Sequence, residues 1–332
     1  MIIVTGGAGF IGSALVWALN RRGREDILIV DHLGASEKWR NLTALRFAEY
    51  IDKKDFLAKL EAGAFGAGIE AILHMGACSS TTETDANYLM ENNYRYTLRI
   101  AQWRERHEKT RLIYASSAAT YGNGELGYAD DERNLHRLKP MNIYGYSKHL
   151  FDCAALQKGW LKSIVGLKYF NVFGPNENHK AEMRSVINKA YPRVRDEGVM
   201  TLFQSHRPDY KNGEQLRDFI YIKDAVAMTL FFLDHPDKNG IFNVGSGKAR
   251  CWNDVAAALF KAAEKEPKIE YIPMPPEIRD MYQYCTRADL GKLRAAGCAH
   301  ECRAIEDAVI DYVRNYLRTG SLLSNDKEDK GA

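Results

Sequence analysis

The feature that most constrains the fold lies at the start of the chain, where two short apolar runs flank a glycine-rich stretch. Residues 1–5 are Met-Ile-Ile-Val-Thr, residues 6–12 are Gly-Gly-Ala-Gly-Phe-Ile-Gly, and the second apolar run ends at Asp31. This order predicts a strand, a phosphate-binding turn, a helix to about Arg22 and a second strand at 27–31. The helix would direct unpaired N–H groups and its positive dipole end at an anion, so a dinucleotide is the expected ligand.

The spacing of three glycines and one acid makes this expectation specific. Two overlapping patterns of three glycines each are present. Gly7, Gly9 and Gly12 form G-x-G-x-x-G, and Gly6, Gly9 and Gly12 form G-x-x-G-x-x-G. In such a turn the glycines allow a sharp bend, a close approach to the pyrophosphate and tight packing of helix on strand. Asp31 follows at the distance expected for an acid that binds a ribose hydroxyl.

Strands and helices alternate through the first half of the chain. This alternation implies βαβ units and a doubly wound, Rossmann-type parallel sheet, with the ligand over the carboxyl ends of the strands. Further strands are predicted at 71–76, 112–117 and 164–169, and helices at 85–107 and from Asn142 onward.

The chain changes character after residue 170, where long polar loops separate short elements. We predict a nucleotide-binding Rossmann domain over 1–170 and a smaller, mixed α/β, mainly substrate-binding domain over 171–324. Segments within about 217–250, among them 219–222 and 241–244, are expected to return to the main sheet. Residues 325–332 are expected to form a frayed tail.

The composition restricts the class of protein. With 332 residues, of which 45% are hydrophobic and 27% charged, the chain can bury a full core and is typical of a globular enzyme. A net charge of +3 is too small to favour nucleic acid or an anionic membrane surface as a partner. No signal peptide is recognised and no apolar run approaches the ~18 residues that span a bilayer, so we expect a cytoplasmic location.

The six cysteines are scattered, which predicts reduced thiols rather than a disulfide framework. Only the segment Cys298-Ala-His300-Glu-Cys302 resembles a cluster of metal ligands. It offers three ligands and matches no standard zinc motif, so we predict no metal site.

Candidate catalytic residues follow the predicted strand at 112–117. Tyr144 and Lys148 are four residues apart on the helix that begins near Asn142, so their side chains share one helix face. Tyrosine has a pKa near 10 in water, and nearby positive charge would favour its ionised form. We therefore expect Tyr144 to accept a proton from an alcohol, Lys148 to lower the pKa of Tyr144 and bind a ribose, and Ser117 or Ser116 to orient the reacting oxygen. The simpler alternative is a surface pair of side chains with no catalytic role.

Taken together, several segments resemble the extended short-chain dehydrogenase/reductases that act on nucleotide sugars. The similarity covers nearly the whole chain and is carried by residues 6–12, 116–122, 144–148, 169–175, 217–224 and 242–247. Within that superfamily, residues 76–83, Asn92-Asn93-Tyr94 and His179-Lys180 resemble the ADP-glycero-manno-heptose 6-epimerases, which supply heptose for the lipopolysaccharide inner core.

The resemblance implies a redox epimerisation. In that family, bound NADP removes hydride from C6 of the heptose and returns it to the opposite face, and the subunits assemble into homo-oligomeric rings of five. Inversion needs proton carriers on both sides of the carbon. The family pattern places Tyr144 on one side and Lys180 on the other, with Ser117 as the catalytic serine. A solvated loop lysine or a phosphate contact is the alternative for Lys180.

The resemblance also implies two sets of binding residues. Arg217 suits a pyrophosphate because its planar fork can bind two oxygens. The expected cofactor contacts are Gly6, Gly9, Phe10, Ile11, Gly12, Asp31, His32, Lys38, Lys53, Met75, Gly76, Ala77, Cys78, Ser79, Asn92, Lys148 and Val172. The expected contacts of the ADP-heptose substrate are Ser117, Asn171, Lys180, Glu182, Lys189, Phe203, Gln204, Ser205, His206, Arg217 and Tyr282.

The choice of cofactor rests on opposing charges. Asp31 would favour the free ribose hydroxyls of NAD and repel a 2′-phosphate. In the family, Lys38 and Lys53 pair with that phosphate, and both are present, so NADP is expected, with NAD as the alternative. The chain departs from the family pattern at His32, Met75, Asn178, Glu182, Lys189 and 206–215.

Two other functions compete with this one. Another nucleotide-sugar epimerase or dehydratase of the same superfamily, such as a UDP-hexose 4-epimerase, would share the scaffold. Dehydratases usually carry an acidic pair beside the catalytic serine, whereas Ala118-Ala119 occupies that place here. A non-catalytic protein that senses dinucleotide would have no use for the serine, tyrosine and lysine set.

Overall fold

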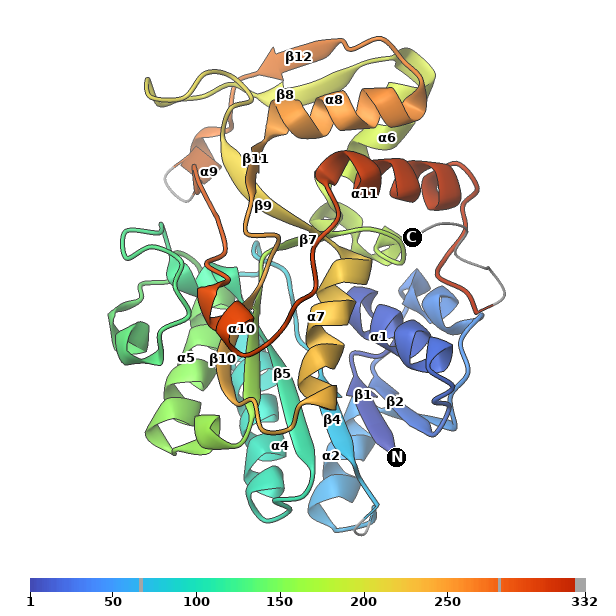
Figure 1. Cartoon of the computed structure of the whole chain (residues 1–332), viewed down its shortest axis with the longest axis vertical. Helices are drawn as coiled ribbons and strands as arrows, with labels where there is room; N and C mark the ends of the chain where they lie inside the picture. The colour runs from blue at the N-terminus through green and yellow to red at the C-terminus, as the bar shows by residue number, and fades with distance from the viewer. Residues whose placement is uncertain (66–67, 280–281, 326–332) are drawn as a thin grey trace.

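A parallel β-sheet forms the centre of the molecule (Figure 1). The structure, a computed structural model, describes residues 1–65, 68–279 and 282–325, so the predicted tail lies, apart from residue 325, outside the described residues. Over these residues the sheet has seven strands, all in parallel pairs, which confirms the predicted Rossmann-type architecture. In sheet order they are β10 (Gly240–Val244), β6 (Val165–Tyr169), β5 (Arg111–Ser117), β4 (Ala71–His74), β1 (Ile2–Thr5), β2 (Ile27–Asp31) and β3 (Glu49–Asp52).

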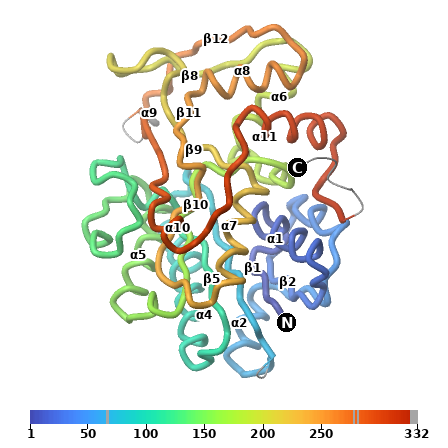
Figure 2. The backbone as a smooth tube through the Cα atoms, viewed as in Figure 1, coloured from blue at the N-terminus to red at the C-terminus, as the bar shows by residue number. Residues whose placement is uncertain are grey.

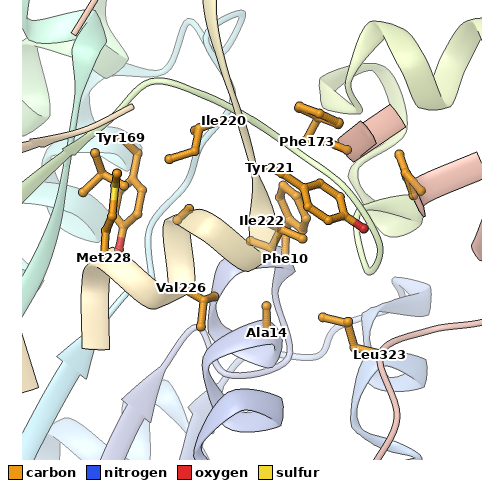
Figure 3. Packing of buried hydrophobic residues seen from close by; sticks show 14 of the residues in the cluster. Phe10, Ala14, Tyr169, Phe173, Ile220, Tyr221, Ile222, Val226, Met228 and Leu323 are labelled. Carbon is orange, nitrogen blue, oxygen red and sulfur yellow. The ribbon is translucent and has the colours of Figure 1, made fainter. Parts of the chain in front are cut away.

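Both faces of this sheet are buried, because its strands are apolar on both sides. In β1, Ile2 and Val4 point into one core and Ile3 points into the other. The helices α1 (Phe10–Arg21) and α7 (Ile222–Asp234) cover the first face, and α2 (Lys53–Glu61), α4 (Tyr96–Glu105) and α5 (Ile143–Gln157) cover the second (Figures 1 and 2). Figure 3 shows Phe10 and Ala14 of α1 beside α7 in the first core.

The strand order reverses between β1 and β4, which are neighbours in the sheet. Such a switch point opens a crevice at the carboxyl ends of the strands, because the two connecting helices leave on opposite faces. The glycine turn after β1 and the loop after β4 therefore meet at this crevice.

The predicted helix at 85–107 is interrupted by a wider turn. It consists of α3 (Ala86–Leu89), a π-helical turn at Met90–Arg95, and α4. Within the π turn, the buried Asn93 side chain donates to the Cys78 carbonyl over 2.9 Å and accepts from its N–H over 2.8 Å. The turn thus fixes the loop after β4, and π turns often occur at such functional positions.

A smaller part of the molecule lies at the top of Figure 1. There β8 (Met200–Phe203) pairs in parallel with β12 (Ile269–Ile272), beside the helices α6 (Val186–Glu197), α8 (Trp252–Ala263) and α11 (Ile305–Tyr312). The short helix α9 (Pro276–Arg279) lies near this part, whereas α10 (Gly291–Ala295) contacts β10. Among the described residues, no helix combines the length and hydrophobicity that crossing a membrane requires.

A third sheet joins the two parts and corrects one prediction. Residues 241–244 join the main sheet in β10, as expected, but the expectation that 219–222 return to it is wrong. Instead β9 (Leu216–Tyr221) lies between β7 (Asn171–Phe173) and β11 (Ala249–Cys251). The physical reason is that β10 pairs with the outer edge of β6, so no place beside β6 remains for β9.

Candidate active site

The glycine turn between β1 and α1 forms a cradle of backbone atoms. Gly6 has a φ of +64°, a backbone conformation that residues with a side chain rarely adopt. A Cβ at Gly12 would lie 2.1 Å from the Gly6 carbonyl oxygen, and one at Gly6 would lie 2.7 Å from the Gly76 Cα. Because the N-cap residue is Gly9, no capping side chain occupies the N–H groups in the first turn of α1. The turn therefore leaves room and N–H donors for a pyrophosphate, and the residues present fit a dinucleotide.

We expect Gly12→Ala to weaken dinucleotide binding by about tenfold or more, equivalent to at least 1.4 kcal/mol, because the added methyl group must displace the Gly6 backbone. Titration of nucleotide-free protein with dinucleotide measures this. Gly68→Ala is the matched control, since a Cβ there meets nothing within 4 Å. Unchanged affinity in Gly12→Ala would show that the turn does not hold the pyrophosphate.

A cavity of about 360 Å³ opens over this turn and the carboxyl ends of β1, β4 and β5. It brings most of the predicted cofactor residues together with three of the predicted catalytic ones. The predicted residues that line it are Gly6, Gly9, Phe10, Ile11, Gly12, Asp31, His32, Lys38, Lys53, Met75, Gly76, Ala77, Cys78, Ser79, Asn92, Tyr144, Lys148, Lys180 and Ser116, the alternative to Ser117. Val172 lies on β7, and neither it nor Ser117 lines this cavity.

The start of α5 places the tyrosine and lysine at the cavity. Asn142 caps the helix, its side-chain oxygen accepting from the Gly145 N–H over 2.7 Å, as predicted. Tyr144 is half-buried and shares a hydrogen bond with Ser117 at the end of β5. The buried Lys148 ammonium donates to the Ala115 carbonyl over 2.7 Å.

Burial and two neighbouring side chains act on the pKa of Tyr144. Burial raises its pKa most, the hydrogen bond with Ser117 lowers it, and the Cys78 thiol raises it. Burial lowers the pKa of Lys148 itself to about 8, and Asp152 opposes that shift. Burial thus disfavours the ionised form of Tyr144, which a positive charge nearby would favour.

Lys180 reaches the same cavity from a different segment. It belongs to the 3₁₀ turn Asn178–Met183, and its ammonium lies 5.3 Å from the centre of the Phe10 ring. Burial lowers the pKa of Lys180, and the carboxylate of Glu177 opposes this. Lys180 therefore lines the cavity and is partly buried there.

The acidic end of β2 is already neutralised. The Asp31 carboxylate accepts from the N–H groups of Ala8 over 2.9 Å and His32 over 2.7 Å, and from the Lys38 ammonium over 2.7 Å. Lys53 donates to the Asn92 side-chain oxygen over 2.5 Å. Burial lowers the pKa of Lys53, and repulsion from Lys38 contributes, so the two ammonium groups lie close enough to interact.

A second cavity of about 370 Å³ lies between α6, β8 and the start of α8. Three residues of the predicted substrate set line it, namely Lys189, Phe203 and Tyr282. The other lining residues, which sequence reasoning missed, are Val186, Ala190, Arg193, Val199, Met200, Thr201, Leu202, Trp252 and Ile272.

Arg217 lies beside this second cavity. Its guanidinium is stacked 4.8 Å from the Tyr282 ring and 5.9 Å from the Trp252 ring, and the Trp252 indole N–H donates to the Tyr282 hydroxyl over 2.9 Å. Arg217 is 7% exposed, and burial lowers its pKa. No spacing rule in the sequence links Trp252 to Arg217, because the tertiary fold alone brings α8 to β9.

The remaining predicted substrate residues line neither cavity. Asn171 is exposed on β7, and the Glu182 side chain is 91% exposed, 3.9 Å from the Lys189 ammonium. His206 and Ser205 contact the Tyr284 hydroxyl. The His206 N–H donates to it over 3.0 Å, and the Ser205 hydroxyl lies 3.3 Å from it. The residues outside both cavities are Ser117, Asn171, Glu182, Gln204, Ser205, His206 and Arg217.

The Cys-x-His-x-Cys segment does not form the cluster that its spacing suggested. His300 and Cys302 instead gather with Asp224, their ligand atoms lying within 4.8 Å of one another. His300 is 3.0 Å from the Asp224 carboxylate, which also accepts from the Arg303 N–H over 3.1 Å. Burial raises the pKa of the Cys302 thiol to about 12, so it stays protonated at neutral pH.

Comparison with known proteins places this geometry in a family. Residues 2–245 match the model of the NAD dependent epimerase/dehydratase family. The chain is 54% identical to the ADP-L-glycero-D-manno-heptose-6-epimerase of Nitratidesulfovibrio vulgaris, covering 96% of this chain and 98% of that one. It is 47% identical to the enzyme of the same name from Fusobacterium nucleatum, with the same coverage of both chains.

Solved structures share the whole architecture. The ADP-L-glycero-D-manno-heptose-6-epimerase of Helicobacter pylori superposes with a TM-score of 0.80 at 27% identity over 95% of each chain. The Thermus thermophilus UDP-glucose 4-epimerase, solved in complex with NAD, superposes with a TM-score of 0.76 at 25% identity, over 96% of this chain and 99% of that one.

Proposed function

Since this chain belongs to the NAD dependent epimerase/dehydratase family, we propose that it inverts C6 of the heptose in ADP-glycero-manno-heptose, for the lipopolysaccharide inner core. The observation that carries the proposal is that Tyr144 and Lys180, from separate segments, line one cavity over the glycine turn. A nicotinamide dinucleotide bound over that turn supplies the acceptor and then the donor of hydride.

The protein's own residues move the protons. Tyr144, as the phenolate, takes the proton of the C6 hydroxyl while that carbon loses hydride, which leaves a ketone. Burial raises the pKa of Tyr144, so the phenolate would be favoured by the positive charge of an oxidised nicotinamide when the dinucleotide is bound. Lys180 gives a proton to the ketone oxygen as hydride returns to the opposite face. Exchange with solvent restores both side chains, and the C6 configuration is inverted.

The second cavity would hold the nucleotide end of the substrate. Arg217 is a buried cation, and its planar guanidinium suits the two phosphates of a nucleoside diphosphate. Phe203 and Tyr282, together with the apolar residues of β8, offer surfaces against which a base can pack.

The direct test supplies ADP-glycero-manno-heptose of one C6 configuration and follows that configuration by NMR. We expect a mixture of both C6 epimers to form. Inversion of a UDP-hexose at C4, with ADP-heptose left unchanged, would instead identify a nucleotide-sugar 4-epimerase. Binding of dinucleotide with no turnover of either sugar would identify a sensing protein.

We propose NADP as the cofactor, with NAD as the alternative. Two N–H groups and Lys38 already satisfy the Asp31 carboxylate, so it would repel a 2′-phosphate less than a free acid would. Lys38 and Lys53 repel each other, and an anion between them would relieve that repulsion.

We expect Lys53→Met to lower the preference for NADP over NAD by about tenfold, because one phosphate-pairing charge is lost. Affinities for both dinucleotides, measured by calorimetry, check this. Lys54→Met is the matched control, since Lys54 is exposed next to Lys53 on α2. An equal loss of affinity for NAD and NADP would contradict a 2′-phosphate site at Lys53.

Assembly and location belong to the same proposal. A homo-oligomer, as a ring of five, and a cytoplasmic location are what the family resemblance implies. Sedimentation of the purified protein tests the first of these.

A further inference from the structure

The turn that carries Lys180 is held in an uncommon backbone conformation. In the described part of the chain, three residues other than glycine have a positive φ, and two of them, Asn176 at 75° and Ala181 at 47°, flank this lysine. Such conformations cost free energy and persist only where surrounding contacts impose them. The contacts that impose this one are therefore informative about how Lys180 is placed.

Asn176 fixes one end of the turn. The side-chain N–H of Asn176 donates to the Ser13 hydroxyl of α1 over 3.0 Å, and the side-chain oxygen of Asn176 accepts from the Leu323 N–H over 2.9 Å. Its carbonyl accepts from the Asn41 side chain over 3.0 Å. These contacts join the turn to the dinucleotide-binding helix and to the C-terminal segment.

Glu177 fixes the rest of the turn. Its carboxylate has no exposure and accepts from the N–H groups of Gly174 over 3.2 Å and Ser185 over 2.5 Å, and from the Ser185 hydroxyl over 2.7 Å. It also accepts from the Tyr312 hydroxyl of α11 over 3.1 Å. The backbone closes the turn, since the Lys180 N–H donates to the Glu177 carbonyl over 3.0 Å. One buried acid thus spans the segment from Gly174 to Ser185.

Glu177 also acts on the charge of Lys180. Burial favours the neutral amine, and Glu177 is the group that opposes this, so the two effects compete at the lysine nitrogen. The other groups near this ammonium are His179 on the same turn and the Phe10 ring of α1. The charges of Lys180, Lys38 and Asp31 in turn act on His179, whose pKa burial lowers to about 4.

We propose that Glu177 is a positioning residue that holds the turn of Lys180 at the cavity and that its carboxylate favours the protonated form of this lysine. This inference rests on the proposed function. Because Tyr144 is held by α5 and β5, the loss of Glu177 affects the proton transfer at Lys180 and spares the one at Tyr144.

The experiment compares the two halves of the reaction in one preparation. Each C6 epimer of ADP-glycero-manno-heptose is mixed with the holoenzyme, and formation of reduced nicotinamide is followed by stopped-flow absorbance over a range of pH. The Lys180→Met variant assigns the two epimers. The epimer that this variant no longer oxidises reports the Lys180 face, and the other epimer reports the Tyr144 face. Partial unfolding lowers both signals equally, so their ratio does not depend on the folded fraction.

For Glu177→Gln we expect at least a tenfold fall in the ratio of Lys180-face to Tyr144-face rates, equivalent to about 1.4 kcal/mol. The midpoint of the pH profile on the Lys180 face should move to lower pH, because the carboxylate that favours the ammonium is lost. Tyr312→Phe is the matched control. It removes one donor from Glu177 and keeps the charge, so it should leave that midpoint unchanged.

If Glu177→Gln lowers the oxidation rates on both faces equally and does not shift the midpoint of the pH profile, the inference is overturned and the proposed function stands. Absence of reduced nicotinamide from either epimer with the unaltered enzyme would overturn the proposed function and, with it, this inference.

Discussion

Replacing Tyr144 with phenylalanine is expected to slow epimerisation by about 10²–10⁴-fold, the usual contribution of one general acid–base group. The variant loses the phenolic oxygen that accepts the C6 hydroxyl proton and keeps the ring that lines the cavity. The dinucleotide should therefore stay bound. Turnover followed by NMR and nucleotide released on denaturation measure the two effects.

The matched control lies two residues further along the same helix. Tyr146 is 45% exposed and points away from the cavity, so Tyr146→Phe should keep full activity. Undiminished turnover in Tyr144→Phe would refute the assignment of the proton acceptor. Loss of bound dinucleotide in that variant would instead assign Tyr144 to cofactor binding.

Replacing Lys180 with methionine is expected to abolish net inversion while preserving the chemistry of one face. The ammonium is the proton carrier opposite Tyr144, and methionine keeps most of the apolar contact with Phe10. We expect a loss of about 10²–10⁴-fold in epimerisation. In pre-steady-state experiments, reduced nicotinamide should still form from one C6 epimer.

The control for Lys180 is Lys162→Met, which removes an exposed ammonium after α5 and should change nothing. Equal impairment of both faces in Lys180→Met would mark Lys180 as a substrate-binding residue. A pH titration adds a second check, because burial places the pKa of Lys180 below that of a free lysine.

The local features of the nucleotide-binding half could be predicted from the sequence because neighbours along the chain create them. The glycine turn, the cap at Asn142 and the shared face of Tyr144 and Lys148 all depend on contacts within a few residues. The alternation of strands and helices likewise fixed the parallel sheet, since connections between parallel strands obey strict rules.

Features that depend on distant segments were missed or mistaken. The place of β9 depends on β10 pairing with the edge of β6, which no local pattern reveals. The contact of the Lys148 ammonium with the Ala115 carbonyl of β5 could not be read from the spacing of Tyr144 and Lys148 on their helix. No sequence pattern indicates Trp252, because it contacts Arg217 only through the packing of α8 against β9.

By itself, the sequence predicted the Rossmann-type sheet and a glycine turn suited to a dinucleotide, and it supplied the tyrosine and lysine of one helix face. Only the tertiary structure decided that Lys180 lines the same cavity, that Asp31 is already neutralised, and that Glu177 ties the Lys180 turn to α11. The reason is that helix faces and turns follow from short-range geometry, whereas burial and charge compensation arise between segments far apart in the chain.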